Sequence, residues 1–81
     1  MKTPDVMSIE MEAVAIAAPQ GSSWKHAKSG GEYAVIGHCF LEADAAPAVL
    51  YALTSDGEHP IWARAASEFL DGRFTRISLT D

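Results

Sequence analysis

The sequence predicts a mainly β protein: a small SH3-like β-barrel of about five short strands. The chain has 81 residues, 48% hydrophobic and 21% charged, which is typical of one small globular domain. From residue 32 onward the chain alternates short apolar runs with tight turns, and Gly37 stands in the middle of the longest run. A flat sheet of this size would leave its edges exposed, whereas curling it into a barrel removes them.

Residues 1–18 are expected to form an N-terminal helix or an appended segment. Thr3 is a favourable N-cap residue, and Pro4 is common at the first helical position. The negative charge of Asp5 is favourable near the positive end of the helix dipole. The apolar residues that follow recur at helical spacing: Val6, Ile9, Ala13, Ile16 and Ala17. A half-buried strand is a rival interpretation, because apolar and polar residues also alternate from Met7 to Ala13. A loosely ordered tail is a third. The start signals favour the helix.

Residues 19–31 are rich in glycine, proline and serine, which predicts a loop leading into the main fold. This loop carries Trp24 and His26, so part of it should pack on the barrel. We expect His26 to form a hydrogen bond within the loop and to fix its path.

The barrel itself is expected over residues 32–81. Apolar runs predict strands at 33–41, 49–54, 61–64 and 73–79. Gly37 predicts a bulge in the first of these strands. Residues 65–70 suit one helical turn before the last strand, closed by a turn in which Gly72 takes a positive φ and Asp71 bonds nearby amides.

Charge and composition limit the class of partner. Six basic and eleven acidic residues give a net charge of -5, so direct binding to a nucleic-acid backbone is not expected. No apolar run approaches the roughly 20 residues of a membrane span. These features predict a cytoplasmic protein without a membrane partner. The three histidines and the single Cys39 lack metal-ligand spacing, so neither a metal nor another cofactor is expected.

Several spaced motifs carry a family resemblance. The run from Trp24 to Gly37 reads WKHAKSGGEYAVIG, and further matches follow at Glu42, 47–51, 62–64 and 68–69. Together they resemble a family of short, mostly bacterial proteins, the domain of unknown function sixteen fifty-three. Its pattern is His and Lys before a glycine and tyrosine, then a Val-x-Tyr strand, a Trp-x-Arg strand and a phenylalanine.

The resemblance covers about residues 24–74, and it implies an SH3-type barrel but no activity. Two positions depart from the family pattern. Ala52 stands where the family often carries an arginine, and Ala65 stands where a proline is common. If that arginine binds an anion in relatives, the resemblance implies a reduced capacity for anions here.

The candidate ligand-binding residues are aromatic or basic: His26, Tyr33, Tyr51, Trp62 and Arg64. Trp62 and Arg64 are two apart on one predicted strand and therefore face the same side. If Tyr51 lies across from them, two aromatic rings and a guanidinium converge, as suits a planar ligand, a carboxylate, a proline-rich peptide or an unstacked base. The alternative interpretation makes Tyr51 and Trp62 core residues and pairs Arg64 with Glu42 or Glu68.

Three functions remain open at this point. The first is a binding module that uses this aromatic and arginine face for a peptide, a protein or a small planar ligand. The second is a homo-oligomeric interaction protein, such as a homodimer, assembled through the N-terminal apolar segment. The third is an acidic inhibitor of a nucleic-acid-binding protein. We do not expect an enzyme and predict no catalytic residue, because the sequence reveals no nucleophile paired with a base.

Overall fold

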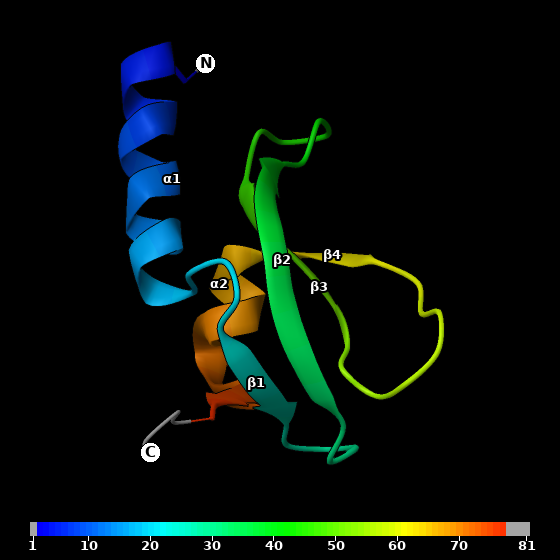
Figure 1. The fold of residues 1–81 in the computed structure, drawn as a ribbon. Helices are drawn as coiled ribbons and strands as arrows, with labels where there is room; N and C mark the ends of the chain where they lie inside the picture. Colours follow the sequence, from blue (N-terminus) through cyan, green and yellow to red (C-terminus); the bar gives the residue numbers. More distant parts are fainter. Residues whose placement is uncertain (1, 78–81) are drawn as a thin grey trace.

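The computed structural model describes residues 2–77, which form one antiparallel sheet, an N-terminal helix and a short helical segment (Figure 1). The strands are β1 (Ser23–His26), β2 (Glu32–Phe40), β3 (Pro47–Leu53), β4 (Trp62–Ala65) and β5 (Phe74–Arg76). The helices are α1 (Pro4–Ala17), α2 (Ala66–Glu68) and η1 (Phe69–Arg73). The predicted mainly β fold of five strands, with a helical turn before the last one, is confirmed.

The order of the five strands in the sheet is β4-β3-β2-β1-β5. β1 to β4 follow one another as a meander, and β5 returns to pair with β1. Within the described residues, β4 and β5 are the two edges and form no ladder with each other. The α2–η1 segment connects these edges and packs on the inner face of the curled sheet. The two edges are therefore linked through this helical segment and not by backbone hydrogen bonds between them.

Helix α1 forms as its start signals predict. The Thr3 side chain accepts a hydrogen bond from the backbone N–H of Val6 at 3.2 Å, and Pro4 occupies the first turn. Both ends of the helix are tied to the sheet region. Lys2 Nζ donates to the carbonyl oxygen of Ala45 at 3.0 Å, and His38 Nε2 donates to that of Ala18 at 2.7 Å. The helix is thus docked along its length.

The buried face of α1 differs from the apolar stripe that the sequence suggests. Val14 and the C-cap residue Ala18 are buried in the core, and Met11 packs against them. The suggested stripe lies on the opposite side, where Val6, Ile9 and Ile16 are 44%, 67% and 72% exposed. The helix therefore carries apolar residues on two faces, only one of which contacts the sheet.

Residues 23–26 form strand β1, although the sequence analysis assigns them to a loop, so this assignment is wrong. Trp24 pairs with Tyr33 of β2, and His26 pairs with Phe74 of β5. A four-residue strand between glycine-rich turns gives little local signal, and its hydrogen-bond partners come from distant parts of the chain. The sheet consequently begins at Ser23 and not at residue 32.

The predicted bulge at Gly37 is confirmed. Val35 pairs with Tyr51 whereas Gly37 pairs with Leu50, so β2 contains one more residue than β3 at this point. The extra residue exchanges the two faces of β2. His38 thereby faces the same side as Val35 and reaches the end of α1.

The core is built around aromatic rings. Phe69 of η1 is fully buried and stacks on Phe74 with ring centroids 4.4 Å apart. The centroid of its ring also lies 5.0 Å from that of Trp24 and 5.2 Å from that of Tyr51. The turn that follows is formed as predicted, since Gly72 has a φ of 109° and the Arg73 backbone N–H donates to Asp71 Oδ1 at 3.2 Å.

The last predicted strand, 73–79, is shorter in the structure. β5 covers Phe74–Arg76, and the prediction for positions 78 and 79 lies outside the described residues. Over the described part of the chain, no helix is both long enough and apolar enough to cross a membrane.

Candidate ligand-binding pocket

Strand pairing determines which side chains share the inner face of the sheet. Tyr51 and Trp62 are direct cross-strand partners, so their side chains point to the same side. Arg64 lies two residues beyond Trp62 and shares that side. Tyr33 is two residues before Val35, the partner of Tyr51, and joins the same face.

The other end of the sheet supplies three more side chains to this face. Trp24 pairs with Tyr33, which places Trp24 inside, and His26 two residues later points the same way. Phe74 pairs with His26 and therefore also points inward. The alternation along five paired strands thus explains why residues far apart in sequence converge.

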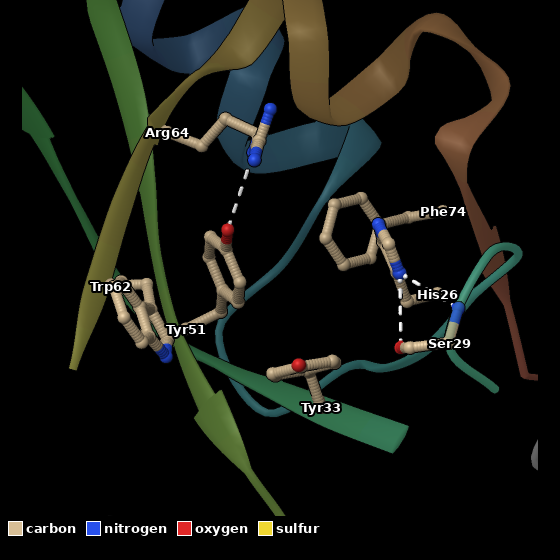
Figure 2. A pocket seen from close by; sticks show the side chains of 7 residues that line it. All are labelled: His26, Ser29, Tyr33, Tyr51, Trp62, Arg64 and Phe74. Carbon is tan, nitrogen blue, oxygen red and sulfur yellow. Dashed lines mark hydrogen bonds between the residues drawn. The ribbon is translucent and has the colours of Figure 1, made fainter. Parts of the chain in front are cut away.

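These side chains surround a cavity of about 290 Å³ between the two edges of the sheet. Figure 2 shows Trp62 and Tyr51 on one side, with His26 and Phe74 facing them from the other. Tyr33 lies at the bottom of this view and Arg64 at the top. The cavity is lined by seven residues: His26, Ser29, Tyr33, Tyr51, Trp62, Arg64 and Phe74.

The floor of the cavity consists of rings packed edge to face. The centroids of Tyr33, Tyr51 and Phe74 are 5.3 to 5.8 Å from one another, at interplanar angles of 71° to 80°. Tyr51 and Phe74 are each only 5% exposed, so this floor is continuous with the core. Trp62, by contrast, is 51% exposed and forms the rim. The pocket therefore has a rigid aromatic base and one accessible aromatic wall.

Arg64 is held in place at the top of the pocket by two contacts. Its Nε donates to the Tyr51 hydroxyl at 3.3 Å, and its Nη1 donates to Glu68 Oε1 at 3.2 Å. A guanidinium has five N–H donors, so three of them find no acceptor among the described residues. The Tyr51 oxygen accepts from Arg64, which leaves its own hydrogen available to a ligand.

His26 is oriented by the turn that joins β1 to β2. Its Nδ1 accepts the backbone N–H of Ser29 at 3.2 Å and lies 3.0 Å from Ser29 Oγ. Because Nδ1 accepts a hydrogen bond, the neutral ring carries its hydrogen on Nε2. No described residue accepts from that Nε2–H. The expected hydrogen bond of His26 within this segment is confirmed, and it leaves the second ring nitrogen of this lining residue as a donor without an acceptor among the described residues.

An alternating row of charges runs from the pocket along α2 and η1. Glu68 contacts Arg64 at 3.2 Å and Arg73 at 3.9 Å, and Arg73 forms a two-point contact with Asp71 at 2.8 and 3.0 Å. The side-chain hydrogen bond from Arg73 lowers the pKa of Asp71, and the same bond raises the pKa of Arg73. Both carboxylates lie outside the pocket lining, which contains no acidic residue.

All five residues that the sequence analysis singles out line this one cavity. The two aromatic residues differ in burial, since Tyr51 is buried in the core and Trp62 is exposed. Arg64 forms an ion pair with Glu68. Ser29 and Phe74 complete the lining but are absent from the predicted set. Only the pairing of β5 with β1 brings Phe74 to the pocket, and no local motif of the sequence indicates that pairing.

The two departures from the family pattern lie away from the cavity. Ala52 and Ala65 each follow an inward-facing residue directly along their strands and therefore point to the outer face of the sheet. An arginine at position 52 would not enter the pocket. Among residues 2–77 no three His, Cys, Asp or Glu side chains gather closely enough to hold a metal ion.

Comparisons of the chain with models of protein families, with curated proteins and with solved structures found no match.

Proposed function

We propose that this protein is a non-enzymatic binding module that holds a small planar ligand in the aromatic pocket. The observation that supports the proposal most directly is the convergence of seven side chains, from five strands and one turn, on a cavity of about 290 Å³. Ligand pockets in proteins typically measure about 300 to 1,000 Å³ and combine apolar walls with a few polar groups. This cavity is at the lower end of that range, which favours a ligand with a single ring system.

The aromatic geometry supports a flat ligand in particular. The exposed face of Trp62 offers a stacking surface, and Tyr33, Tyr51 and Phe74 form a base that is already packed. A preformed base lowers the ordering cost of binding. A flat ring can stack on Trp62 while its polar substituents meet the N–H and O–H groups at the rim.

The closest nucleophile and base in the pocket are Ser29 and His26, and their geometry supports a structural role. His26 Nδ1 accepts the backbone N–H of Ser29, and Ser29 Oγ accepts the backbone N–H of Gly31 at 3.2 Å. Both contacts close the turn between β1 and β2. A catalytic histidine is normally oriented by a third group, and none of residues 2–77 forms a hydrogen bond with the Nε2 of His26. The proposal therefore assigns binding and not catalysis to the pair.

Nuclear magnetic resonance titration of the full chain tests this function. Panels of small aromatic compounds, nucleotides and proline-rich peptides are added to protein labelled with ¹⁵N. We expect the aromatic compounds to shift the signals of His26, Tyr33 and Trp62. Trp62→Ala should weaken binding at least tenfold, because it removes the stacking wall, which corresponds to about 1.4 kcal/mol.

Ile61→Ala is the matched control for this variant. Ile61 directly precedes Trp62 and is 62% exposed, but it does not line the cavity. Its replacement should leave the affinity unchanged. Shifts confined to other surfaces, with the pocket silent for every compound, would refute the proposal.

A second candidate function is self-association through α1. The outward stripe of Val6, Ile9 and Ile16 runs the length of the helix, and the exposed Ala13 between them permits close approach of a second helix. Such a stripe can pair with its own copy about a twofold axis. Light scattering over a range of concentrations tests this idea. Ile9→Glu should abolish any dimer, and a monomer at all concentrations of the unmodified chain would end this candidate.

The hypothesis of an acidic inhibitor stays a prediction. Two of the carboxylates that such a role would use, Glu68 and Asp71, already pair with arginines of the same chain. This pairing favours the pocket as the first surface to test.

A further inference from the structure

We infer that the ligand of the aromatic pocket is an aromatic carboxylate: a single flat ring that bears one negatively charged group. The inference rests on the proposed binding function and names the class of ligand. It depends on which polar groups line the cavity and which of their hydrogen bonds are already made.

The lining is basic and rich in donors. Arg64 carries a permanent charge and His26 presents an Nε2–H, whereas none of the seven lining residues is acidic. The hydroxyl groups of Tyr33 and Tyr51 add further donors. A cationic ligand would meet Arg64 without a lining carboxylate to offset it. The charge of the pocket lining therefore differs in sign from the net charge of the whole chain, which is -5.

Arg64 is fixed in a geometry that leaves donors for an anion. Its contacts with Tyr51 and Glu68 use Nε and Nη1, and no described residue accepts a hydrogen bond from Nη2. A guanidinium held by two neighbours loses little further freedom when a carboxylate binds. Glu68 shares this guanidinium, so it competes with the ligand for the positive charge.

The arrangement also separates the ring from the charged group. Trp62, Tyr51 and Tyr33 contribute faces and edges on which a ring can pack, while Arg64 projects its guanidinium from the upper part of the view (Figure 2). A ring alone would leave these donors without acceptors, and an anion alone would leave the aromatic base unused. An aromatic carboxylate satisfies both.

Three probes of nearly identical shape test the charge preference: benzoate, benzamide and benzamidine. At neutral pH they carry negative, zero and positive charge. Titration of the full chain, followed by nuclear magnetic resonance, should give benzoate an affinity at least about tenfold above that of benzamide, since hydrogen bonds between charged groups exceed neutral ones by this margin. Benzamidine should bind more weakly than benzamide.

Two variants distinguish a binding role of Arg64 from a structural one. Arg64→Gln should reduce the affinity for benzoate to that for benzamide and leave benzamide within about threefold. Glu68→Gln removes the competing carboxylate and should strengthen benzoate binding, an outcome that a purely structural role would not produce.

The outcomes separate the two proposals. Equal affinities for the three probes, or a preference for benzamidine, would overturn the inference while leaving the pocket as a binding site. Failure of all three probes, while another compound of the wider panel still shifts the pocket signals, would overturn the inference alone. Silence of the pocket for the whole panel would overturn the proposed function as well.

Discussion

Tyr51 and Trp62 face each other directly across β3 and β4 on the same side of the sheet, yet Tyr51 is 5% exposed and Trp62 is 51% exposed. The difference follows from their neighbours. Tyr51 lies on an inner strand, and its ring centroid is 5.2 Å from that of Phe69 and 5.3 Å from that of Phe74. Trp62 lies on an edge strand. One pair of aromatic residues thus joins the core to the surface of the pocket.

This contrast predicts that replacing the two residues by alanine lowers the free energy of unfolding by different amounts. Tyr51→Ala should lower the free energy of unfolding by about 3 kcal/mol or more, because it opens a cavity among packed rings. Trp62→Ala should cost about 1 kcal/mol or less, the usual contribution of an exposed cross-strand pair. Urea denaturation of both variants measures the difference. Equal costs would contradict the division of this pair between core and rim.

Phe69 is predicted to be the most sensitive position of the helical segment. It is fully buried and contacts three aromatic rings, so Phe69→Ala should lower the free energy of unfolding by about 3 to 5 kcal/mol. Leu70 is the control, because it is the next residue but is 39% exposed. Leu70→Ala should cost far less. If the two variants had the same denaturant midpoint, Phe69 would not anchor the helical segment.

Gly72 is predicted to tolerate a side chain poorly even though there is room for one. Its φ of 109° lies where residues with a Cβ are strained, so Gly72→Ala should destabilise the fold by about 1 to 2 kcal/mol. Gly37→Ala is the control. A Cβ there would meet Leu50 at an ordinary 3.7 Å. Thermal denaturation compares the two, and an equal or larger loss at Gly37 would contradict the assignment of strain to Gly72.

The lowered pKa of Asp71 predicts that the stability of the fold decreases in acid. Because Arg73 lowers the pKa of Asp71 in the folded chain below the usual value of 3.8, the ionised carboxylate stabilises the fold above that pH. The stabilisation is lost as the pH falls through the lowered pKa. Asp71→Asn should therefore lower the Tm at neutral pH, with the difference from the unmodified protein shrinking in strong acid.

The effect at Asp71 should be small, because the ion pair is exposed to water. Asp56→Asn provides the comparison, since Asp56 is exposed in a turn and forms no ion pair with the described residues. Its Tm should follow that of the unmodified protein at every pH. A constant difference between Asp71→Asn and the unmodified protein from neutral pH to strong acid would contradict the linkage.

Local chemistry accounts for the elements that the sequence predicts correctly. Thr3 and Pro4 start α1, Gly37 produces the bulge, and Asp71 with Gly72 forms the last turn. In each case the required conformation or cap is a property of one or two adjacent residues. The alternation of Trp62 and Arg64 on one strand is equally local, which is why their shared face could be predicted.

The same sequence misplaces features that depend on distant partners. Strand β1 is too short to stand out among glycines and serines, and it exists because β2 and β5 pair with it on both sides. The stripe of Val6, Ile9 and Ile16 has the correct spacing for a helix, but Val14 and Ala18 face the sheet. Periodicity predicts a helix without saying which of two apolar faces is buried.

The amino-acid sequence by itself therefore determined a mainly β chain, its bulge and turns, and the set of aromatic and basic residues that are candidates for a binding site. Only the tertiary structure decided that His26 and Phe74 meet Tyr51 and Trp62 around one cavity, and that Tyr51 forms its floor while Trp62 forms its rim. The physical reason is long-range strand pairing. The pairing of β5 with β1 joins segments about 50 residues apart, and burial depends on what packs over each strand after that pairing is made.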